Sequence, residues 1–239
     1  MKLTENTAIV LRNANYREND RMLTLFSPAR GRIEAAARGS RKPKSPLIAA
    51  SELFALGDYL LYEKDGRNTV TSVQLTETFY PLRNDFERLT CGMYLLETCE
   101  AVIQPGKAEH ELFMLLLYTL SRLAFSEQPW RSLLTGYLIH FAAIQGFRPR
   151  LSHCVRCGRR LLPDAPRYFD VQEGGTVCPS CRVRQPVITA GEVQFLMRAL
   201  EGGSSTWVEN EGEKAPLPMM RTYVEQRLEK PIRSGTMLQ

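Results

Sequence analysis

Two short stretches, Cys154-Val-Arg-Cys157 and Cys178-Pro-Ser-Cys181, decide how this chain folds, because they repeat one cysteine spacing on either side of twenty residues. A CxxC turn directs two thiolates at one centre, and two such turns supply the four sulfur ligands that tetrahedral zinc prefers. Four thiolates leave no coordination position open for water, so the expected role is structural. The sequence therefore predicts one structural zinc ion bound by Cys154, Cys157, Cys178 and Cys181.

Two disulfides, or four unrelated core cysteines, are the alternatives to a zinc site. Gly158 follows the first pair and Gly174-Gly175 precedes the second, and glycines let a chain turn tightly around a ligand, which favours the metal. The other two cysteines, Cys91 and Cys99, lie eight residues apart in a predicted helix, beyond disulfide reach, and are expected in the core.

The composition predicts a globular protein with unevenly distributed charge. The 239 residues are 44% hydrophobic, enough to form a core in one large domain or two to three small ones, and the net charge is +5. Residues 1–80 contain twelve basic and nine acidic side chains, and residues 146–186 contain eight basic and three acidic ones. Residues 81–145, between them, contain five basic and seven acidic side chains. Two basic segments therefore flank an acidic one.

The sequence carries no export or membrane signal. Lys2, Glu5 and Arg12 interrupt any apolar run at the N-terminus, so a signal peptide is not expected. The longest apolar run, Leu112–Leu120, has nine residues, about half of what a membrane span needs. Thiolate ligands suit a reducing compartment, so we expect a cytoplasmic protein.

Motifs of common enzyme classes are absent from the sequence. It has no GxxxxGK[ST] phosphate loop, no HExxH and no GxSxG. Of the three histidines, His140 lies in an apolar helix and is expected to be a core residue, and His153 could replace one zinc ligand. Without a nucleophile and base or an open metal position, the chain is expected to bind rather than catalyse.

Five short segments rich in β-forming residues precede any long helix. Turn residues separate them, including the polar stretch Asn13–Asp20 and the hairpin turn Asp65-Gly66. The expected strands are Thr7–Arg12, Arg21–Ser27, Arg32–Arg38, Leu53–Glu63 and Thr69–Phe79. Five strands in about eighty residues predict a small closed barrel, an OB-fold over residues 1–80. A five-stranded SH3-like barrel is the competing fold, because strand spacing alone does not separate the two.

Helical periodicity begins after Asn84 and makes the fold α+β. The expected helices are Asp85–Ile103, Glu109–Phe125, Pro129–Gln145, one from the capping box of Thr189 and Glu192 to Leu200, and Leu217–Leu228. The second is nearly apolar all round, so it is expected at the buried centre of a bundle. The helical domain should cover residues 81–239, with the zinc module inserted at about residues 150–185. The tail after Pro231 is expected to fray.

Six basic side chains gather in the segment from residue 30 to residue 44. They are Arg30, Arg32, Arg38, Arg41, Lys42 and Lys44, against Glu34 alone. Cations concentrated on one loop and strand of a small barrel form the electrostatic groove that single-strand binders use, so we expect a nucleic-acid surface here. A solvated charged loop is the alternative.

Aromatic residues interleave poorly with these cations. Tyr16, Phe26, Tyr59 and Tyr62 are the nearest candidates for base stacking, and they suit the core equally well. Phosphate contacts should therefore dominate, with little sequence preference. A second basic cluster is the alternative DNA surface and comprises Arg148, Arg150, Arg156, Arg159 and Arg160 beside the cysteines.

Four segments resemble the RecO family of DNA repair proteins. They are Tyr16–Asp20, Ala37–Ser45, Gly146–Gly158 and Gly174–Cys181. The similarity runs in the right order from residue 5 to residue 185, and the part after Gly202 is less distinctive. The resemblance implies an N-terminal OB-fold, a helical domain and an inserted zinc module.

For function, the resemblance implies a recombination mediator without bond-breaking chemistry. Such proteins bind single- and double-stranded DNA, anneal complementary strands, and act with RecR to help RecA replace single-strand-binding protein (SSB). The implied SSB contact is an acidic tail with an apolar end, which needs an apolar pocket with a basic rim. The candidate partner-binding residues are Arg122, Arg131 and Arg148. Two other classes of protein remain as alternatives. They are a zinc-containing structural adaptor that does not bind DNA, and an enzyme in which zinc only stabilises the fold.

Overall fold

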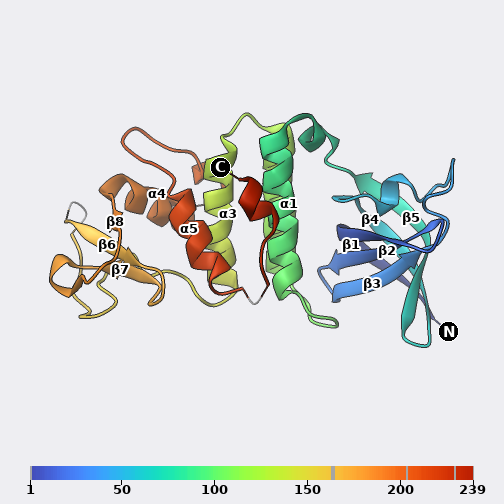
Figure 1. Cartoon of the computed structure of the whole chain (residues 1–239), viewed down its shortest axis with the longest axis horizontal. Coiled ribbons are helices and arrows are strands. Elements are labelled where there is room, and N and C mark those ends of the chain that lie inside the picture. Colours follow the sequence, from blue (N-terminus) through green and yellow to red (C-terminus); the bar gives the residue numbers. More distant parts are fainter. Residues whose placement is uncertain (1, 163–164, 203, 229, 239) are drawn as a thin grey trace. The chain divides into compact units, whose positions relative to one another are not determined.

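The computed structural model describes residues 2–162, 165–202, 204–228 and 230–238. The chain forms two compact units (Figure 1). The barrel unit comprises Met1–Ala124 and Ile232–Gln239, and the cysteine unit comprises Phe125–Pro231. The expected domain boundary at residue 80 stays a prediction, because compactness alone does not show which segments fold independently.

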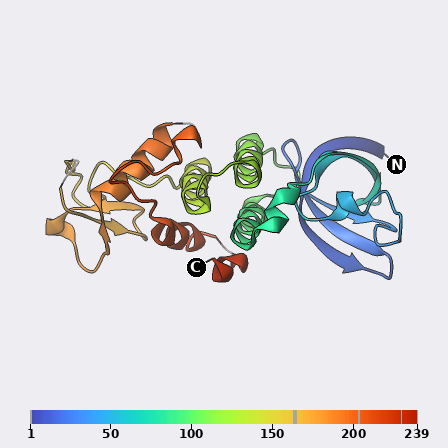
Figure 2. The same ribbon diagram turned by 90° about the horizontal axis from the view of Figure 1, so that it is seen from above.

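Five strands close into a barrel in the barrel unit. They are β1 (Lys2–Tyr16), β2 (Asp20–Ser27), β3 (Gly31–Ala37), β4 (Leu56–Lys64) and β5 (Arg67–Glu77). Their order is β1-β2-β3-β5-β4, and β3 and β5 pair in parallel where Ala35 lies opposite Asn68. The long strand β1 curves around the barrel and pairs with both β2 and β4 (Figure 2). This order is that of the OB-fold and not of an SH3-like barrel, which confirms the predicted fold.

The inner faces of the strands form the barrel core. Along β3, the side chains of Ile33, Ala35 and Ala37 are buried, and the intervening residues face outward, as the period of two requires. Tyr59 also lies inside, where its hydroxyl donates a hydrogen bond to the carbonyl of Ala50 at 2.8 Å. The barrel therefore closes around these core side chains.

The first hairpin is longer than expected. The sequence predicts a loop over Asn13–Asp20, but β1 continues to Tyr16 and pairs with β2 as far as Asp20, leaving residues 17–19 as the turn. The prediction is wrong here because polar side chains also fit the solvent side of a hairpin, where cross-strand pairing holds the strands. Arg17 adopts a left-handed conformation, with φ at 55°, to make this turn.

Two helices of the barrel unit pack on the outer surface of the barrel. They are α1 (Phe86–Val102) and α2 (His110–Phe125), each within one residue of its predicted bounds. The ring of Phe113 on α2 meets the ring of Phe26 edge to face, at a centroid distance of 5.2 Å. Glu100 on α1 binds Arg12 at 3.1 Å and Arg32 at 3.5 Å. These contacts cover part of the surface that β1, β2 and β3 present.

The C-terminal segment returns to the barrel unit. The carboxylate of Glu97 on α1 accepts hydrogen bonds from the backbone N–H groups of Arg233, at 2.6 Å, and Ser234, at 3.3 Å. The prediction of a frayed tail is therefore wrong for residues 232–238, because these backbone groups donate hydrogen bonds to α1.

Five short 3₁₀ helices occur among the described residues. They are η1 (Ala49–Ser51), η2 (Tyr80–Asn84), η3 (Pro179–Cys181), η4 (Ser204–Thr206) and η5 (Ser234–Met237).

The cysteine unit combines three helices with a small sheet. Its elements are α3 (Trp130–Ile144), β6 (Arg167–Asp170), β7 (Gly175–Val177), β8 (Val187–Ile188), α4 (Ala190–Glu201) and α5 (Leu217–Glu225), with sheet order β7-β6-β8. The predicted capping box is confirmed, because the hydroxyl of Thr189 accepts a hydrogen bond from the N–H of Glu192 at 3.2 Å. In neither unit does a described helix have the length and apolar character that a membrane span requires.

Helix α3 is buried over more of its length than α2, contrary to expectation. Eleven of its fifteen residues are buried, against six of sixteen in α2, where Met114 is 62% exposed. Gly136 lets the ring of Trp207 lie directly on α3, since a Cβ there would be 2.3 Å from that ring. The prediction is wrong because an apolar run measures composition, whereas burial depends on what packs against each face.

Gly31 joins the barrel to the loop between α1 and α2. It has φ at +62°, and a Cβ there would lie 2.2 Å from the carbonyl oxygen of Gln104 and 2.5 Å from that of Lys107. We predict that Gly31→Ala lowers the free energy of unfolding by about 2–4 kcal/mol, because backbone strain adds to the clash. The matched control is Gly66→Ala, with φ at +71° and open space around it, which should cost about 1 kcal/mol. Urea denaturation measures both, and equal losses would contradict the close approach.

Candidate metal centre and nucleic-acid interface

The four cysteines lie on two tight backbone turns. In the first turn, the N–H of Gly158 donates to the carbonyl of Cys154 at 2.9 Å, and the N–H of Cys154 donates to the carbonyl of Arg159 at 2.8 Å. Gly158 has φ at +72°, which a glycine adopts without strain. In the second turn, the N–H of Cys181 donates to the carbonyl of Cys178 at 3.1 Å. Each turn therefore points two thiols the same way.

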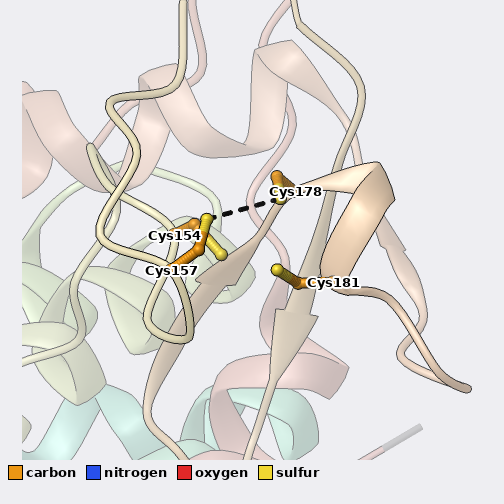
Figure 3. Close-up of side chains that lie close together, drawn as sticks. All are labelled: Cys154, Cys157, Cys178 and Cys181. Carbon is orange, nitrogen blue, oxygen red and sulfur yellow. Dashed lines mark hydrogen bonds between the residues drawn. The ribbon is translucent and has the colours of Figure 1, made fainter.

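The two turns bring the four sulfur atoms together. Figure 3 shows the side chains of Cys154, Cys157, Cys178 and Cys181 directed at one another, and their Sγ atoms all lie within 4.8 Å of one another. The Sγ atoms of Cys157 and Cys178 are 3.8 Å apart. Tetrahedral Zn–S bonds of about 2.3 Å put sulfur ligands about 3.8 Å apart, whereas a disulfide needs about 2.05 Å. The geometry thus fits four ligands of one metal ion and not two disulfides.

The protonation of these thiols also fits a bound cation. Burial raises the pKa of Cys154, but hydrogen bonds from the N–H groups of Cys157, Cys178 and Arg156 outweigh it and bring the pKa to about 6. In contrast, hydrogen bonding to Cys178 and Cys157 raises the pKa of Cys181 to about 12. Four neighbouring thiolates repel one another, so a metal dication is what allows all of them to ionise together.

Arg156, inside the first CxxC turn, holds the two turns together. Its guanidinium donates to the carbonyl of Cys181 at 2.8 Å and binds Asp170 and Glu173, each at 2.9 Å. Burial raises the pKa of Asp170, but the N–H groups of Glu173 and Gln172, the amide of Gln185 and Arg156 together hold it below its ordinary value. Within the alternative DNA surface, Arg156 is therefore committed to the cysteine unit. The other four members, Arg148, Arg150, Arg159 and Arg160, are exposed.

Hydrogen bonds dock the basic loop after β3 onto the turn between β1 and β2. The N–H of Gly39 donates to the carboxylate of Asp20 at 2.8 Å, and the N–H of Arg41 donates to the carbonyl of Asn19 at 3.0 Å. The guanidinium of Arg41 reaches the carbonyl of Glu18, also at 3.0 Å. Two loops far apart in sequence thus form one surface at this end of the barrel.

The six predicted DNA-binding cations do not share one environment. Arg30 lies 4.0 Å from Glu63, and Arg32 binds Glu34 at 2.8 Å in addition to Glu100. Acidic neighbours therefore engage Arg32 on two sides, whereas Arg30 has one long, solvent-exposed ion pair. The other four cations, Arg38, Arg41, Lys42 and Lys44, are exposed, and none of them pairs with an acidic side chain among the residues that the structure describes.

The four aromatic candidates for base stacking also differ in their exposure. Phe26 and Tyr59 are fully buried and Tyr62 is half-buried, whereas Tyr16 is 41% exposed beside the docked loop. The guanidinium of Arg17 lies 5.2 Å from the centre of the Tyr16 ring. Arg17 is a cation of this surface that the sequence analysis missed, although it lies in the Tyr16–Asp20 segment of the family resemblance.

The three candidate partner-binding arginines belong to different parts of the chain. Arg122 lies in the barrel unit, whereas Arg131 lies in the first turn of α3 and Arg148 follows the C-terminal end of this helix, which is about 20 Å long at 1.5 Å per residue. The guanidinium of Arg131 lies 4.7 Å from the centre of the Trp130 ring. Only Arg148 of these three is among the residues that line the two cavities found in the cysteine unit, in a cavity of about 550 Å³ that Leu200 also lines.

The histidines lie outside the metal cluster. The Nε2 atom of His140 is 2.7 Å from the carbonyl oxygen of Ala199, and its ring lies 5.2 Å from that of Trp207. Its polar contact is therefore satisfied, as predicted, but the side chain is half-buried and not in the core. The Nδ1 atom of His153 contacts the hydroxyl of Ser152 at 2.9 Å.

The two remaining cysteines lie in α1. Cys91 and Cys99 are both fully buried there, as expected, and burial raises the pKa of Cys91.

Comparison with known proteins covers both units. The family model described as Recombination protein O N terminal matches residues 1–79, and Recombination protein O C terminal matches residues 83–236. The chain belongs to the RecO family. Its RecO relatives include a DNA repair protein RecO of Desulfitobacterium hafniense (strain DSM 10664 / DCB-2), 33% identical over 96% of this chain and 87% of the relative. The RecO of Nocardioides sp. (strain ATCC BAA-499 / JS614) is 31% identical over 97% of each chain.

The four cysteines should be required for the fold of the cysteine unit in this RecO chain. Structural zinc contributes on the order of 10–16 kcal/mol of apparent binding energy in small modules. We predict that replacing any one of Cys154, Cys157, Cys178 and Cys181 by Ser abolishes stoichiometric metal binding and unfolds residues 150–185, leaving the barrel folded. Metal analysis and hydrogen exchange measure the two effects. Cys99→Ala is the control and should keep one metal ion per chain; a folded wild-type chain with well under one would contradict the prediction.

Proposed function

We propose that this RecO chain is a recombination mediator that binds single- and double-stranded DNA and anneals complementary strands. With RecR, it would help load RecA onto single-stranded DNA coated with SSB. The observation that carries the proposal is the docked basic loop, where Arg38, Arg41, Lys42 and Lys44 gather on an OB-fold and form no ion pair with an acidic side chain among the described residues. OB-folds bind oligonucleotides through this end of the barrel.

The loop suits phosphate recognition without base specificity. Its cations are exposed, and Arg41 among them donates a hydrogen bond to the carbonyl of Glu18. Lysine and arginine neutralise phosphates and release condensed counterions, an effect that does not depend on sequence. A mediator must act on any exposed strand, so a grip on phosphates fits the proposed role.

The metal in the proposal is one structural zinc ion. Four thiolates are the ligand set typical of structural zinc, and they leave no position for a reacting water. The cysteine unit would then act as a scaffold, and the chain as a binding protein rather than an enzyme. Zinc thiolates and free buried cysteines both suit a reducing compartment, so the proposed location is the cytoplasm. The chain would associate with the nucleoid during repair.

The proposal includes two folding domains and several partners. The OB-fold of residues 1–80 would bind DNA, and the helical domain of residues 81–239 would carry the zinc module and the contacts with other proteins. A weak DNA grip combined with a contact to the SSB tail raises the effective concentration of the chain on coated strands, where neither contact alone suffices. RecR and, indirectly, RecA complete the partner set.

DNA binding by the loop should depend on salt in a defined way. If about four cations neutralise phosphates, the slope of log affinity against log salt on single strands is roughly −3. We predict that the triple variant Arg38→Ala/Arg41→Ala/Lys42→Ala reduces the slope to roughly −1 and weakens binding to all sequences alike. Fluorescence anisotropy at several salt concentrations measures both quantities.

The control for this experiment removes the same charge elsewhere. Lys2→Ala/Lys107→Ala/Lys214→Ala also removes three positive charges from exposed side chains and should keep the steep slope. An unchanged slope in the loop variant would move the site to the exposed cluster Arg148, Arg150, Arg159 and Arg160. Absence of any salt-dependent binding by the wild-type chain would favour the adaptor that ignores DNA.

The SSB tail offers a separate test of the partner assignment. Arg148 is the candidate for its acidic groups, because it lines a cavity together with apolar Met197 and Leu200. We predict that Arg148→Ala weakens binding of a fluorescent SSB-tail peptide about tenfold at low salt, since a charge-assisted contact is lost. Arg122→Ala and Arg131→Ala are the matched controls. Binding that ignores all three substitutions and the salt would place the tail elsewhere, and no binding at all would remove this partner.

A further inference from the structure

The outer surface of β1, β2 and β3 is divided into a covered half and an open half. The pairing register aligns outward-facing side chains in rows across the three strands: Arg12 lies opposite Thr24, which lies opposite Glu34. Hydrogen bonds confirm this row, because the hydroxyl of Thr24 contacts Arg12 at 3.4 Å and Glu34 at 3.1 Å. OB-folds use the surface around β2 and β3 to bind oligonucleotides, so the state of each row decides what can bind.

The helices close the half of this surface nearest the turn between β2 and β3. Phe26 is fully buried under Phe113 of α2. Glu100 of α1 binds both Arg12 and Arg32, so these ion pairs lie along the middle of the surface. The backbone and inner atoms of these rows are covered, and the side chains of Arg12 and Glu34 that remain exposed are engaged in ion pairs.

The other half of the surface is open. The next row consists of Ala14, Met22 and Ala36, with Ala14 exposed and the other two half-buried. The last row begins with Tyr16 opposite Asp20, and the register continues from Arg21 opposite Ala37 to place Arg38 beside Asp20. The row of Ala14, Met22 and Ala36 forms a small apolar floor. The last row borders this floor with the ring of Tyr16 at one end and Arg38 at the other, and between them lies the carboxylate of Asp20, which accepts the N–H of Gly39.

The dimensions of the floor suit bases and not a duplex. Three strands are about 10 Å wide, since neighbouring strands lie about 4.8 Å apart, and two rows are about 7 Å apart along the strands. This area accommodates one or two bases, and it ends at the row in which Arg12 pairs with Glu100. In a duplex the base faces are stacked and unavailable, so a duplex reaches only the surrounding cations.

We propose that this open half is a single-strand-selective subsite, in which an unstacked base lies on the floor of Ala14, Met22 and Ala36 and stacks on the ring of Tyr16. Arg17 and Arg38 bind the phosphates on either side of that base. The inference rests on the proposed DNA binding and adds how the chain distinguishes single strands from duplexes. The cations of the docked loop serve both forms of DNA, and Tyr16 serves the single strand alone.

Substitution of Tyr16 tests the subsite. Stacking of a base on an aromatic ring corresponds to about a 5- to 100-fold gain in affinity. Tyr16→Leu should therefore weaken single-strand binding by about that factor, leave duplex binding within about twofold, and keep the salt slope, because no charge is removed. Tyr16→Phe should bind like the wild type. The matched control is Tyr80→Leu, since Tyr80 is 63% exposed with the Arg83 guanidinium 5.8 Å from its ring.

An abasic single strand supplies a second measurement that does not depend on how well a variant folds. The wild-type chain should bind an abasic strand about 5- to 100-fold more weakly than a normal strand, whereas Tyr16→Leu should bind the two equally. Equal losses on single and double strands, or a Tyr16→Leu variant that matches Tyr80→Leu, would overturn the subsite. Neither result would contradict the proposed function, because the salt dependence of DNA binding by the loop variant tests that function in a separate experiment.

Discussion

Four sulfur atoms within 4.8 Å of one another are the constraint on which the cysteine unit depends. A dication placed between thiolates at this separation offsets their mutual repulsion, so the two converging backbone turns form a site that could hold a metal ion. The strands around the cluster are only two to four residues long, too short to be stable without it. Arg156 adds a second tie between the turns through Cys181, Asp170 and Glu173.

The barrel unit is held by different forces and does not need the metal. Its core consists of side chains inside the closed sheet, and the helices are fixed to its outer surface by Phe26 and by the carboxylate of Glu100. One of the contacts that fix the helices, the ion pair of Glu100, also engages Arg32, whereas the cations of the docked loop stay without ion pairs among the described residues. The position of the helices thus sets how much of the outer surface of the barrel stays open.

Much of the fold could be predicted from the sequence because it depends on local patterns. The cysteine spacing predicted the cluster, and the helical period placed α1, α2 and α3 within one residue of their bounds. Residues whose role depends on distant neighbours could not be assigned. Arg32 looks like its neighbour Arg38 in the sequence, yet only Arg32 meets Glu100, sixty-eight residues away. Likewise, the apolar run in α2 did not reveal that one of its faces is exposed.

The site predictions divide for the same reason. The spacing of the cysteines in the sequence predicts that they form a cluster. Arg17, in contrast, is assigned to the charged surface only because the fold places the turn at residues 17–19 beside the loop at Gly39 and Arg41. Of the three arginines assigned to a partner, Arg148 lines a cavity together with Met197 and Leu200, a proximity that residue spacing in the sequence does not reveal. Charge counts therefore locate a basic segment, and the fold selects which of its side chains are free.

The measurement that tests this account most directly is X-ray absorption at the zinc edge on the purified full-length chain. The account predicts a single shell of four sulfur atoms at about 2.3 Å from zinc, with no nitrogen or oxygen in the shell. A shell containing nitrogen or oxygen would contradict a closed structural site. Zinc-free, folded protein with sulfur pairs at about 2.05 Å would show instead that disulfides hold the cysteine unit together.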